Sequence, residues 1–142
     1  MEAEACAREV IEVVPLGIRW LRAAIRAQEP TWSVPQLVTM GFLRDHPGAS
    51  LSEVAVALGV GLPSASTLIT RLVETGQVDR SDDPLERRRN VLTLTPSGEA
   101  ALAAAIDGGR RALAERMRAL PTVDLDRMAQ SLAVLRELFG EP

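Results

Sequence analysis

The stretch that decides the fold is residues 50–95, SLSEVAVALGVGLPSASTLITRLVETGQVDRSDDPLERRRNVLTLT. It predicts two short helices joined by a turn and followed by a β-hairpin. In the second helix, 62–75, apolar residues recur at i, i+3, i+4, i+7 and i+8, the spacing of one buried helix face. The buried face comprises Ala65, Leu68, Ile69, Leu72 and Val73, and the opposite, polar face carries Ser64, Ser66, Thr67, Thr70 and Arg71.

The polar face of this second helix has the chemistry of a surface that contacts nucleic acid. Short hydroxyl side chains let a helix approach another surface closely, and they can bond phosphates or base edges. Long acidic side chains are absent from this helix until Glu74. We therefore expect the face to contact a polar, anionic partner.

The helix before it has a clear start and end. Ser50 followed by Glu53 is a capping-box pattern, in which each side chain satisfies a backbone N–H of the other residue. Gly59 supplies a left-handed end, and Pro63 lies just inside the next helix. Two helices joined by so short a turn are the helix-turn-helix pattern, which also occurs in proteins that bind no nucleic acid.

The hairpin strengthens the nucleic-acid interpretation. Residues 77–80 and 90–95 read as strands, and residues 81–84 have the composition of a turn. Three arginines follow Glu86 at the loop tip: Arg87, Arg88 and Arg89. Taken alone, such a run is more often a solvated loop, but here it follows a hydroxyl-rich helix, and arginine is favoured in a narrow minor groove.

Residues 71–76, 86–88 and 94–98 resemble the winged helix-turn-helix of MarR-type bacterial transcription regulators. In that family an aspartate in the wing braces an arginine that enters the minor groove. The resemblance assigns the arginine's role to Arg88 and the bracing role to Glu86, where glutamate replaces the family's aspartate. It also implies double-stranded DNA as a partner, a homodimer, and an effector pocket between the dimer helices and the DNA-binding lobe.

Composition limits the function classes. The chain has 142 residues, no lysine and a net charge of −3, which argues against nonspecific wrapping of nucleic acid, and its single cysteine excludes an internal disulfide. One histidine and no glycine-rich phosphate loop leave no candidate catalytic, cofactor or metal site, so we expect no enzyme. No apolar run reaches membrane-spanning length and the N-terminus lacks a basic signal-peptide start, so a cytoplasmic protein is expected.

Residues 3–28 predict a long helix, with a kink near residues 11–15 caused by Pro15. Arg19, Arg22 and Arg26 share one face, which is either a solvated side, the commoner case, or an anion site. Cys6 is either inert or a redox sensor. The peroxide-sensing members of the MarR-type family pair their thiol with tyrosines, which this chain lacks, and inert packing is the commoner case.

A further helix is predicted from the Ser33–Gln36 capping box to about Asp45. Trp20, Trp32 and His46 are the candidates for a small-molecule pocket, because aromatic and apolar walls with few polar groups are typical of such sites. The alternative places the tryptophans in the core and the histidine at a helix end.

Two C-terminal helices follow Thr95-Pro96 and Pro121-Thr122, and each carries an apolar seam that requires a partner helix. A homodimer is favoured over an intramolecular hairpin packed on the lobe, since one compact lobe has too little surface to cover these helices.

The sequence therefore predicts a mainly α fold with a small hairpin wing. Residues 33–98 would form a DNA-binding lobe, and residues 3–28 and 99–139 would form dimerisation helices. The expected function is a ligand-responsive repressor that binds a pseudo-palindromic site. The alternatives are a winged-helix module that binds proteins rather than DNA, and a regulator that senses redox state through Cys6.

Overall fold

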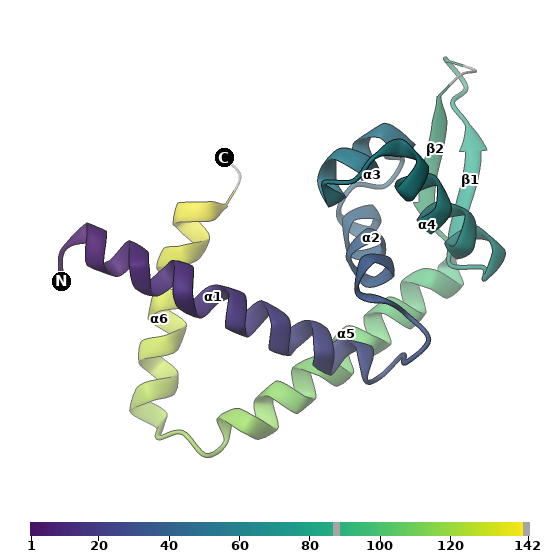
Figure 1. Cartoon of the computed structure of the whole chain (residues 1–142). Helices are drawn as coiled ribbons and strands as arrows, with labels where there is room; N and C mark the ends of the chain where they lie inside the picture. Colours follow the sequence, from purple (N-terminus) through teal and green to yellow (C-terminus); the bar gives the residue numbers. More distant parts are fainter. Residues whose placement is uncertain (87–88, 141–142) are drawn as a thin grey trace. The chain divides into compact units, whose positions relative to one another are not determined.

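The computed structural model describes residues 1–86 and 89–140, which form six helices and one two-stranded antiparallel sheet (Figure 1). The predicted mainly α fold with a hairpin is confirmed. In chain order the elements are α1 (Ala3–Arg26), α2 (Val34–Asp45), α3 (Leu51–Leu58), α4 (Leu62–Glu74), β1 (Val78–Asp82), β2 (Asn90–Leu94), α5 (Pro96–Met117) and α6 (Thr122–Phe139).

The chain divides into two compact units, Met1–Gly109 and Arg110–Pro142. The first unit contains α1 to α4, the hairpin and the N-terminal part of α5, and the second contains the rest of α5 and α6. The hydrophobic core lies in the first unit, where α2, α3, α4 and the hairpin pack together. Its fully buried side chains include Met40, Leu43, Val54, Ile69, Leu72, Leu92 and Leu102.

The helix-turn-helix follows the sequence pattern closely. Gly59 ends α3 in the left-handed conformation with φ 68°, a backbone geometry that glycine adopts without a steric penalty. On α4, the apolar stripe meets the core through Ala65, Ile69 and Leu72, all fully buried. Val73, which was predicted in the same stripe, is 37% exposed because it lies at the edge of that face.

One of the two predicted capping boxes forms completely. The Ser33 hydroxyl accepts a hydrogen bond from the Gln36 N–H, and the Gln36 side chain accepts one from the Ser33 N–H. At α3 the Ser50 hydroxyl accepts from the Glu53 N–H, but the Glu53 carboxylate does not return to the Ser50 backbone. It accepts hydrogen bonds from the Ser50 hydroxyl and from Arg89 instead, so the predicted reciprocal box is wrong in its second half.

The hairpin is longer than predicted. Val78 pairs with Leu94 and Asp82 with Asn90, so Ser81 and Asp82, predicted as turn residues, continue the first strand. The segment before α3 joins this sheet through an isolated bridge between Ala49 and Leu92. That bridge aligns the start of α3 with β2, which matters for the candidate interface.

The start of α5 is packed tightly under the hairpin. The Thr95 hydroxyl accepts from the Gly98 N–H at 2.9 Å, which makes Thr95 the predicted N-cap, and Pro96 is the first helical residue. Gly98 lies close to Gln77, the residue that precedes β1. A Cβ placed on Gly98 would be 2.2 Å from the Gln77 carbonyl oxygen.

The first and last helices have no buried residues. α1 continues as one helix through Pro15, and the kink near residues 11–15 stays a prediction. Large apolar side chains remain exposed on both helices, among them Ile11, Leu16, Leu132 and Phe139. No single helix of the described residues is long and apolar enough to cross a membrane; α3 and α4 reach the required length and hydropathy only as a pair bent by 110°.

Candidate nucleic-acid interface

The exposed side of α4 carries the predicted polar residues. Ser64, Thr67, Thr70 and Arg71 are exposed, whereas Ser66 is only half-buried at the edge of the face. The opposite side of the helix is anchored in the core, so the backbone of α4 is held while its outer side chains remain accessible. The solvent-exposed face of α4 therefore carries hydroxyl groups and one guanidinium group.

Hydrogen bonding within α4 determines what this surface offers. The Thr67 hydroxyl donates to the Pro63 carbonyl oxygen at 3.0 Å, so its remaining lone pairs are left to accept. An accepting hydroxyl suits the amino groups that cytosine and adenine present in the major groove. Arg71, one turn further along, supplies donors and a positive charge suited to phosphate or guanine.

The loop between β1 and β2 is held at its base by Arg89. Its guanidinium Nη2 lies 2.6 Å from Glu53 Oε1, and its Nε lies 3.9 Å from Asp83 Oδ2. The Arg89 N–H also donates to the Glu86 carbonyl oxygen, and the Asp83 N–H donates to the Arg89 carbonyl oxygen. Arg89 therefore faces carboxylates of its own chain.

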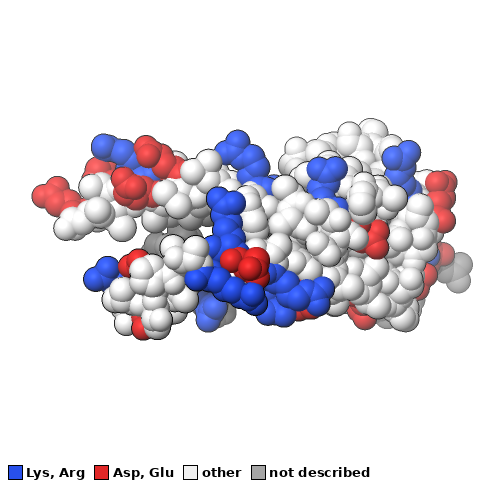
Figure 2. All heavy atoms as spheres, turned by 90° about the horizontal axis from the view of Figure 1, so that it is seen from below, with Lys and Arg blue, Asp and Glu red and all other residues white. Residues whose placement is uncertain are grey.

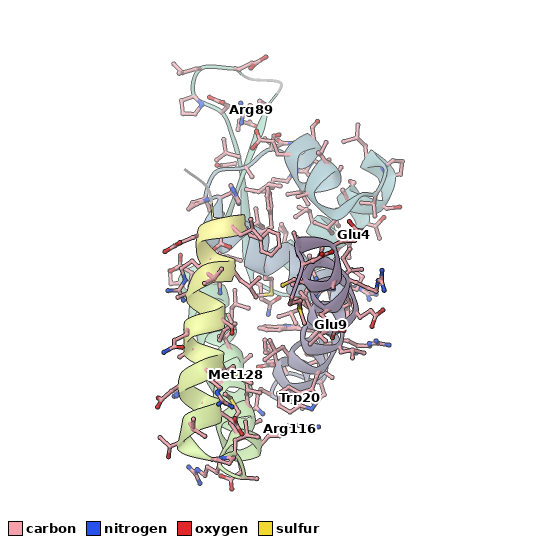
Figure 3. All side chains as sticks on the ribbon, turned by 90° about the vertical axis from the view of Figure 1, so that its left-hand side faces the viewer. Glu4, Glu9, Trp20, Arg89, Arg116 and Met128 are labelled. Atoms are coloured by element: carbon pink, nitrogen blue, oxygen red, sulfur yellow. The ribbon has the colours of Figure 1, made fainter. Side chains whose placement is uncertain are left out.

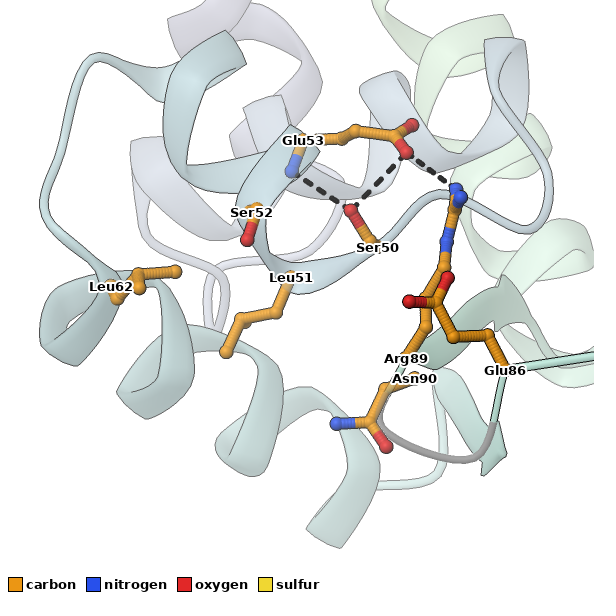
Figure 4. Close-up of a pocket in the computed structure, with 8 residues that line it drawn as sticks. All are labelled: Ser50, Leu51, Ser52, Glu53, Leu62, Glu86, Arg89 and Asn90. Carbon is orange, nitrogen blue, oxygen red and sulfur yellow. Dashed lines mark hydrogen bonds and ion pairs between the residues drawn. The ribbon is translucent and has the colours of Figure 1, made fainter. Parts of the chain in front are cut away.

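A hollow of about 400 Å³ lies beside this contact, between the starts of α3 and α4 and the base of the loop (Figure 4). Figure 4 shows the Glu53 carboxylate between the Ser50 hydroxyl and the Arg89 guanidinium, which its dashed lines connect. The hollow is lined by Ser50, Leu51, Ser52, Glu53, Leu62, Glu86, Arg89 and Asn90.

A second arginine of the hairpin is also held. With its amide oriented so that the oxygen faces the guanidinium, Asn90 accepts from Arg80 Nη2 at 2.9 Å. Of the predicted wing residues, Arg87 and Arg88 lie outside the described residues. Glu86 is exposed. Its bracing of Arg88 stays a prediction.

Two of the three residues predicted to line one small-molecule pocket, Trp32 and His46, lie at opposite ends of α2. Trp32 is 5% exposed and belongs to the core, whereas His46 caps the other end of α2 and stacks on Phe42 at 4.5 Å. A helix of 12 residues separates these two by about 18 Å. Trp20 is half-buried on α1, and Figure 3 shows its place on that helix.

A different hollow, of about 560 Å³, is present along α1. Its apolar walls come from Pro15, Ile18, Ala23 and Val34, and three arginines complete it: Arg19, Arg22 and Arg26. Arg26 is fixed there, because its Nε donates to the Trp32 carbonyl oxygen at 2.9 Å. The predicted shared face of these arginines thus borders a concave site.

Charged side chains of both signs lie on the surface. Figure 2 shows both acidic and basic side chains on the face it presents, with basic ones gathered near its centre, and the net charge of the chain is −3. At the end of α2, a hydrogen bond from Arg44 holds the pKa of Asp45 below its ordinary value; slight burial opposes this, and the charges of Arg44 and His46 reinforce it. Both partners are about half exposed, so this pair contributes little stability.

Within residues 1–86 and 89–140, no three His, Cys, Asp or Glu side chains are grouped as metal ligands. Cys6 is exposed near the start of α1.

Residues 32–89 match the family model described as "MarR family". A putative transcriptional regulatory protein for the hcr operon of Thauera aromatica is 36% identical over 87 residues, covering 57% of this chain and 52% of that protein. The HTH-type transcriptional repressor NicR of Pseudomonas putida is 35% identical over 86 residues, covering 61% and 54%. The matched region spans about half the length of these curated relatives.

Solved structures share the fold over nearly the whole chain. RV1404 from Mycobacterium tuberculosis superposes with a TM-score of 0.82 at 22% identity, covering 100% of this chain and 97% of that one. Apo wild-type MarR from Escherichia coli gives 0.76 at 20% identity, covering 94% and 95%. Residues 32–89 are therefore similar to the MarR family, and the chain shares its fold with these solved structures over nearly its whole length.

Proposed function

We propose that this protein is a sequence-specific DNA-binding transcription regulator that acts as a homodimer on a pseudo-palindromic site. The observation that carries the proposal is the exposed face of α4, where Thr67, Thr70 and Arg71 stand out from a helix whose other side is buried. The sequence relatives are transcription regulators, which supports the same assignment. Such a protein works in the cytoplasm, where chromosomal DNA is located.

In the proposed complex, α4 enters the major groove and the hairpin loop reaches the adjacent minor groove. Ser64, Ser66, Thr67, Thr70 and Arg71 contact bases and phosphates, and Arg88, aided by Arg87, enters the minor groove. The DNA-binding lobe corresponds to residues 33–98. Because the net charge is negative, binding depends on the placement of these arginines and not on overall attraction.

The homodimer is supported by the apolar surface of the terminal helices. On α1, Ile11, Val13 and Leu16 are 57–73% exposed, and on α6, Leu132 and Phe139 are 53% and 67% exposed. Apolar surface of this extent on regular helices is characteristic of a protein–protein interface. A two-fold dimer would present two α4 helices to half-sites about 34 Å apart on one side of the duplex.

The direct test is binding to duplex DNA. Operator sequences would be selected from random duplexes and compared with the DNA upstream of the protein's own gene, and affinity would be measured by fluorescence anisotropy. Arg71→Ala should weaken binding by about 1–3 kcal/mol if Arg71 makes a good groove contact. The matched control is Arg127→Ala, which removes the same charge from the exposed face of α6 and should leave binding unchanged.

Salt dependence separates this proposal from a module that binds only proteins. Neutralising phosphates releases counterions, so the affinity of a DNA-binding dimer should fall by orders of magnitude between about 50 and 200 mM salt. Failure of the wild-type protein to bind any selected duplex at low salt would refute the DNA-binding function.

Ligand response is supported by the hollow along α1. Three guanidinium groups above apolar walls suit an anion with an apolar body, and benzoate is a suitable probe. Such a ligand would release DNA only if it bound the DNA-free and DNA-bound states with unequal affinity. Benzoate should stabilise the wild-type protein in a thermal melt and have less effect on Arg22→Ala, with Arg8→Ala, elsewhere on α1, as the control.

A further inference from the structure

The contact between α3 and the loop of the hairpin joins residues far apart in the sequence. Arg89 reaches back 36 positions to Glu53, with Nη2 2.6 Å from Oε1, and its Nε faces Asp83 at 3.9 Å. The three side chains, here called the wing brace, are partly exposed: Arg89 by 42%, Glu53 by 50% and Asp83 by 21%.

The backbone holds both ends of the wing brace in place. On the α3 side, the Leu92 N–H donates to the Ala49 carbonyl oxygen, and the Gly48 N–H donates to the Leu92 carbonyl oxygen. α3 therefore starts beside β2. The Ser50 hydroxyl then donates to Glu53 Oε1, the same oxygen that Arg89 contacts.

On the loop side, the Asp83 N–H donates to the Arg89 carbonyl oxygen at 2.8 Å, and the Arg89 N–H donates to that of Glu86 at 2.9 Å. The Leu85 N–H donates to Asp83 Oδ1, which leaves the other carboxylate oxygen to face Arg89. Both ends of the loop are therefore tied to each other, and through Glu53 they are tied to α3.

We propose that Arg89 is a positioning residue, held by Glu53 and Asp83, and not a contact to DNA. The proposal rests on the DNA-binding function above and reassigns one of the three predicted wing arginines. A guanidinium between two carboxylates has its charge largely compensated within the protein, so it gains less from a phosphate than a solvated arginine does. Its contribution is to hold the two ends of the loop, at residues 83 and 89, in place before DNA binds. This lowers the conformational entropy that the loop loses on binding.

The rival role for Arg89 is exchange of partners, in which DNA phosphate replaces Glu53. The two roles predict opposite signs for one substitution. If Glu53 only competes for Arg89, Glu53→Gln frees a cation, removes a negative charge near the duplex and tightens binding. If Glu53 instead holds the ends of the loop in place through Arg89, Glu53→Gln weakens DNA binding even though it makes the protein less negative.

The experiment measures duplex affinity as a function of salt for the wild-type chain, Glu53→Gln, Arg89→Gln and the double variant. Glu53→Gln should weaken binding about fivefold, the scale of a partly exposed ion-pair network. Arg89→Gln should weaken it to a similar extent without lowering the salt slope by the one unit that a lost phosphate contact would cost. The double variant should be no weaker than Arg89→Gln, because that variant already lacks the contact with Glu53.

Glu74→Gln is the matched control, since Glu74 is an acid on the exposed side of α4 outside the wing brace. Removing its charge should leave binding unchanged or tighten it slightly. Unchanged or tighter binding by Glu53→Gln would overturn the proposal, and so would a salt slope reduced by about one in Arg89→Gln.

Hydrogen exchange in the DNA-free protein tests the wing brace separately from DNA binding. The N–H groups of Asp83 and Arg89 should exchange faster in Glu53→Gln than in the wild type, and at wild-type rates in Glu74→Gln. Equal rates in all three proteins would overturn the wing brace. If Glu53→Gln showed faster exchange but the wild-type protein bound no duplex, the contact between Arg89 and Glu53 would exist. The DNA-binding function, and with it the positioning role of Arg89, would be refuted.

Discussion

Gly98 shows how strongly one residue can constrain this fold. It is buried at the start of α5, and a Cβ there would lie 2.2 Å from the Gln77 carbonyl oxygen, which already accepts from the Thr95 N–H. Because the obstacle is backbone, it cannot move aside as a flexible side chain does. Gly98→Ala should therefore lower the free energy of unfolding by about 1–3 kcal/mol, measured by urea denaturation.

Gly41 provides the control for this substitution. It lies inside α2, and a Cβ placed there meets nothing within 4 Å. Gly41→Ala should raise stability by about 0.5–1 kcal/mol through helix propensity alone. If Gly98→Ala were as stable as the wild type, the close approach of α5 to the Gln77 backbone would be contradicted.

Arg88 carries the sharpest prediction for recognition at the residue scale. It lies outside the described residues, so its role comes from the sequence and the resemblance. Arg88→Ala should cost about 1–3 kcal/mol of DNA affinity, measured by anisotropy on the selected duplex. A variant that binds like the wild type would show that the minor-groove assignment is mistaken.

Glu53 shows where residue-level reading of the sequence stops. The pattern Ser50 to Glu53 correctly indicated a helix start, since the Ser50 hydroxyl accepts from the Glu53 N–H. The carboxylate, however, takes its second partner from Arg89. A local pattern contains no information about a partner 36 residues further along, so the sequence predicts only a cap at Glu53 and a turn at Asp83.

At the scale of elements, the helix ends are set by short-range bonds that can be tested individually. Ser33 caps α2 through its hydroxyl, and Gln36 closes the box. Ser33→Ala should destabilise the protein by about 1 kcal/mol, because the Gln36 N–H loses the hydroxyl oxygen that accepts its hydrogen bond. Urea denaturation would measure the loss.

Ser131→Ala is the matched control for the cap. Ser131 lies inside α6, where its hydroxyl bonds only the Arg127 carbonyl oxygen of its own helix. Alanine is the better helix former, so stability should be unchanged or slightly higher. A loss in Ser131→Ala equal to that in Ser33→Ala would argue against a specific capping effect.

The hairpin shows an element whose bounds were not predictable from composition. Ser81 and Asp82 have turn chemistry, yet they pair with Val91 and Asn90 in β1 and β2. Pairing with a partner strand satisfies their backbone groups and outweighs their weak strand propensity. The position of the turn was therefore decided by the register and not by residue type.

At the scale of the whole molecule, the proposed homodimer depends on the apolar faces of α1 and α6. Leu132 on α6 is 53% exposed, and Ile11 on α1 is 73% exposed. Leu132→Asp and Ile11→Asp should each shift the protein toward monomers, because a carboxylate would be desolvated in the interface. Sedimentation velocity would report the association state, and the DNA affinity should fall with it.

Val56→Asp is the control for these two variants. Val56 is 82% exposed on α3, so it carries the same kind of apolar exposure outside the terminal helices. It should leave the association state unchanged. Monomeric wild-type protein at micromolar concentration, or loss of dimer in Val56→Asp alone, would contradict the assignment of the interface.

The sequence by itself determined the helices, their caps, the helix-turn-helix and the existence of the hairpin. These features depend on residues within about four positions of each other, such as the stripe Ala65, Ile69 and Leu72 or the Thr95 cap, so a linear pattern contains them. Only the tertiary structure decided that Trp32 lies in the core, that arginines of α1 line a hollow, and that Arg89 faces Glu53 and Asp83. The physical reason is that these contacts arise where distant segments meet, and packing of the whole first unit sets that meeting.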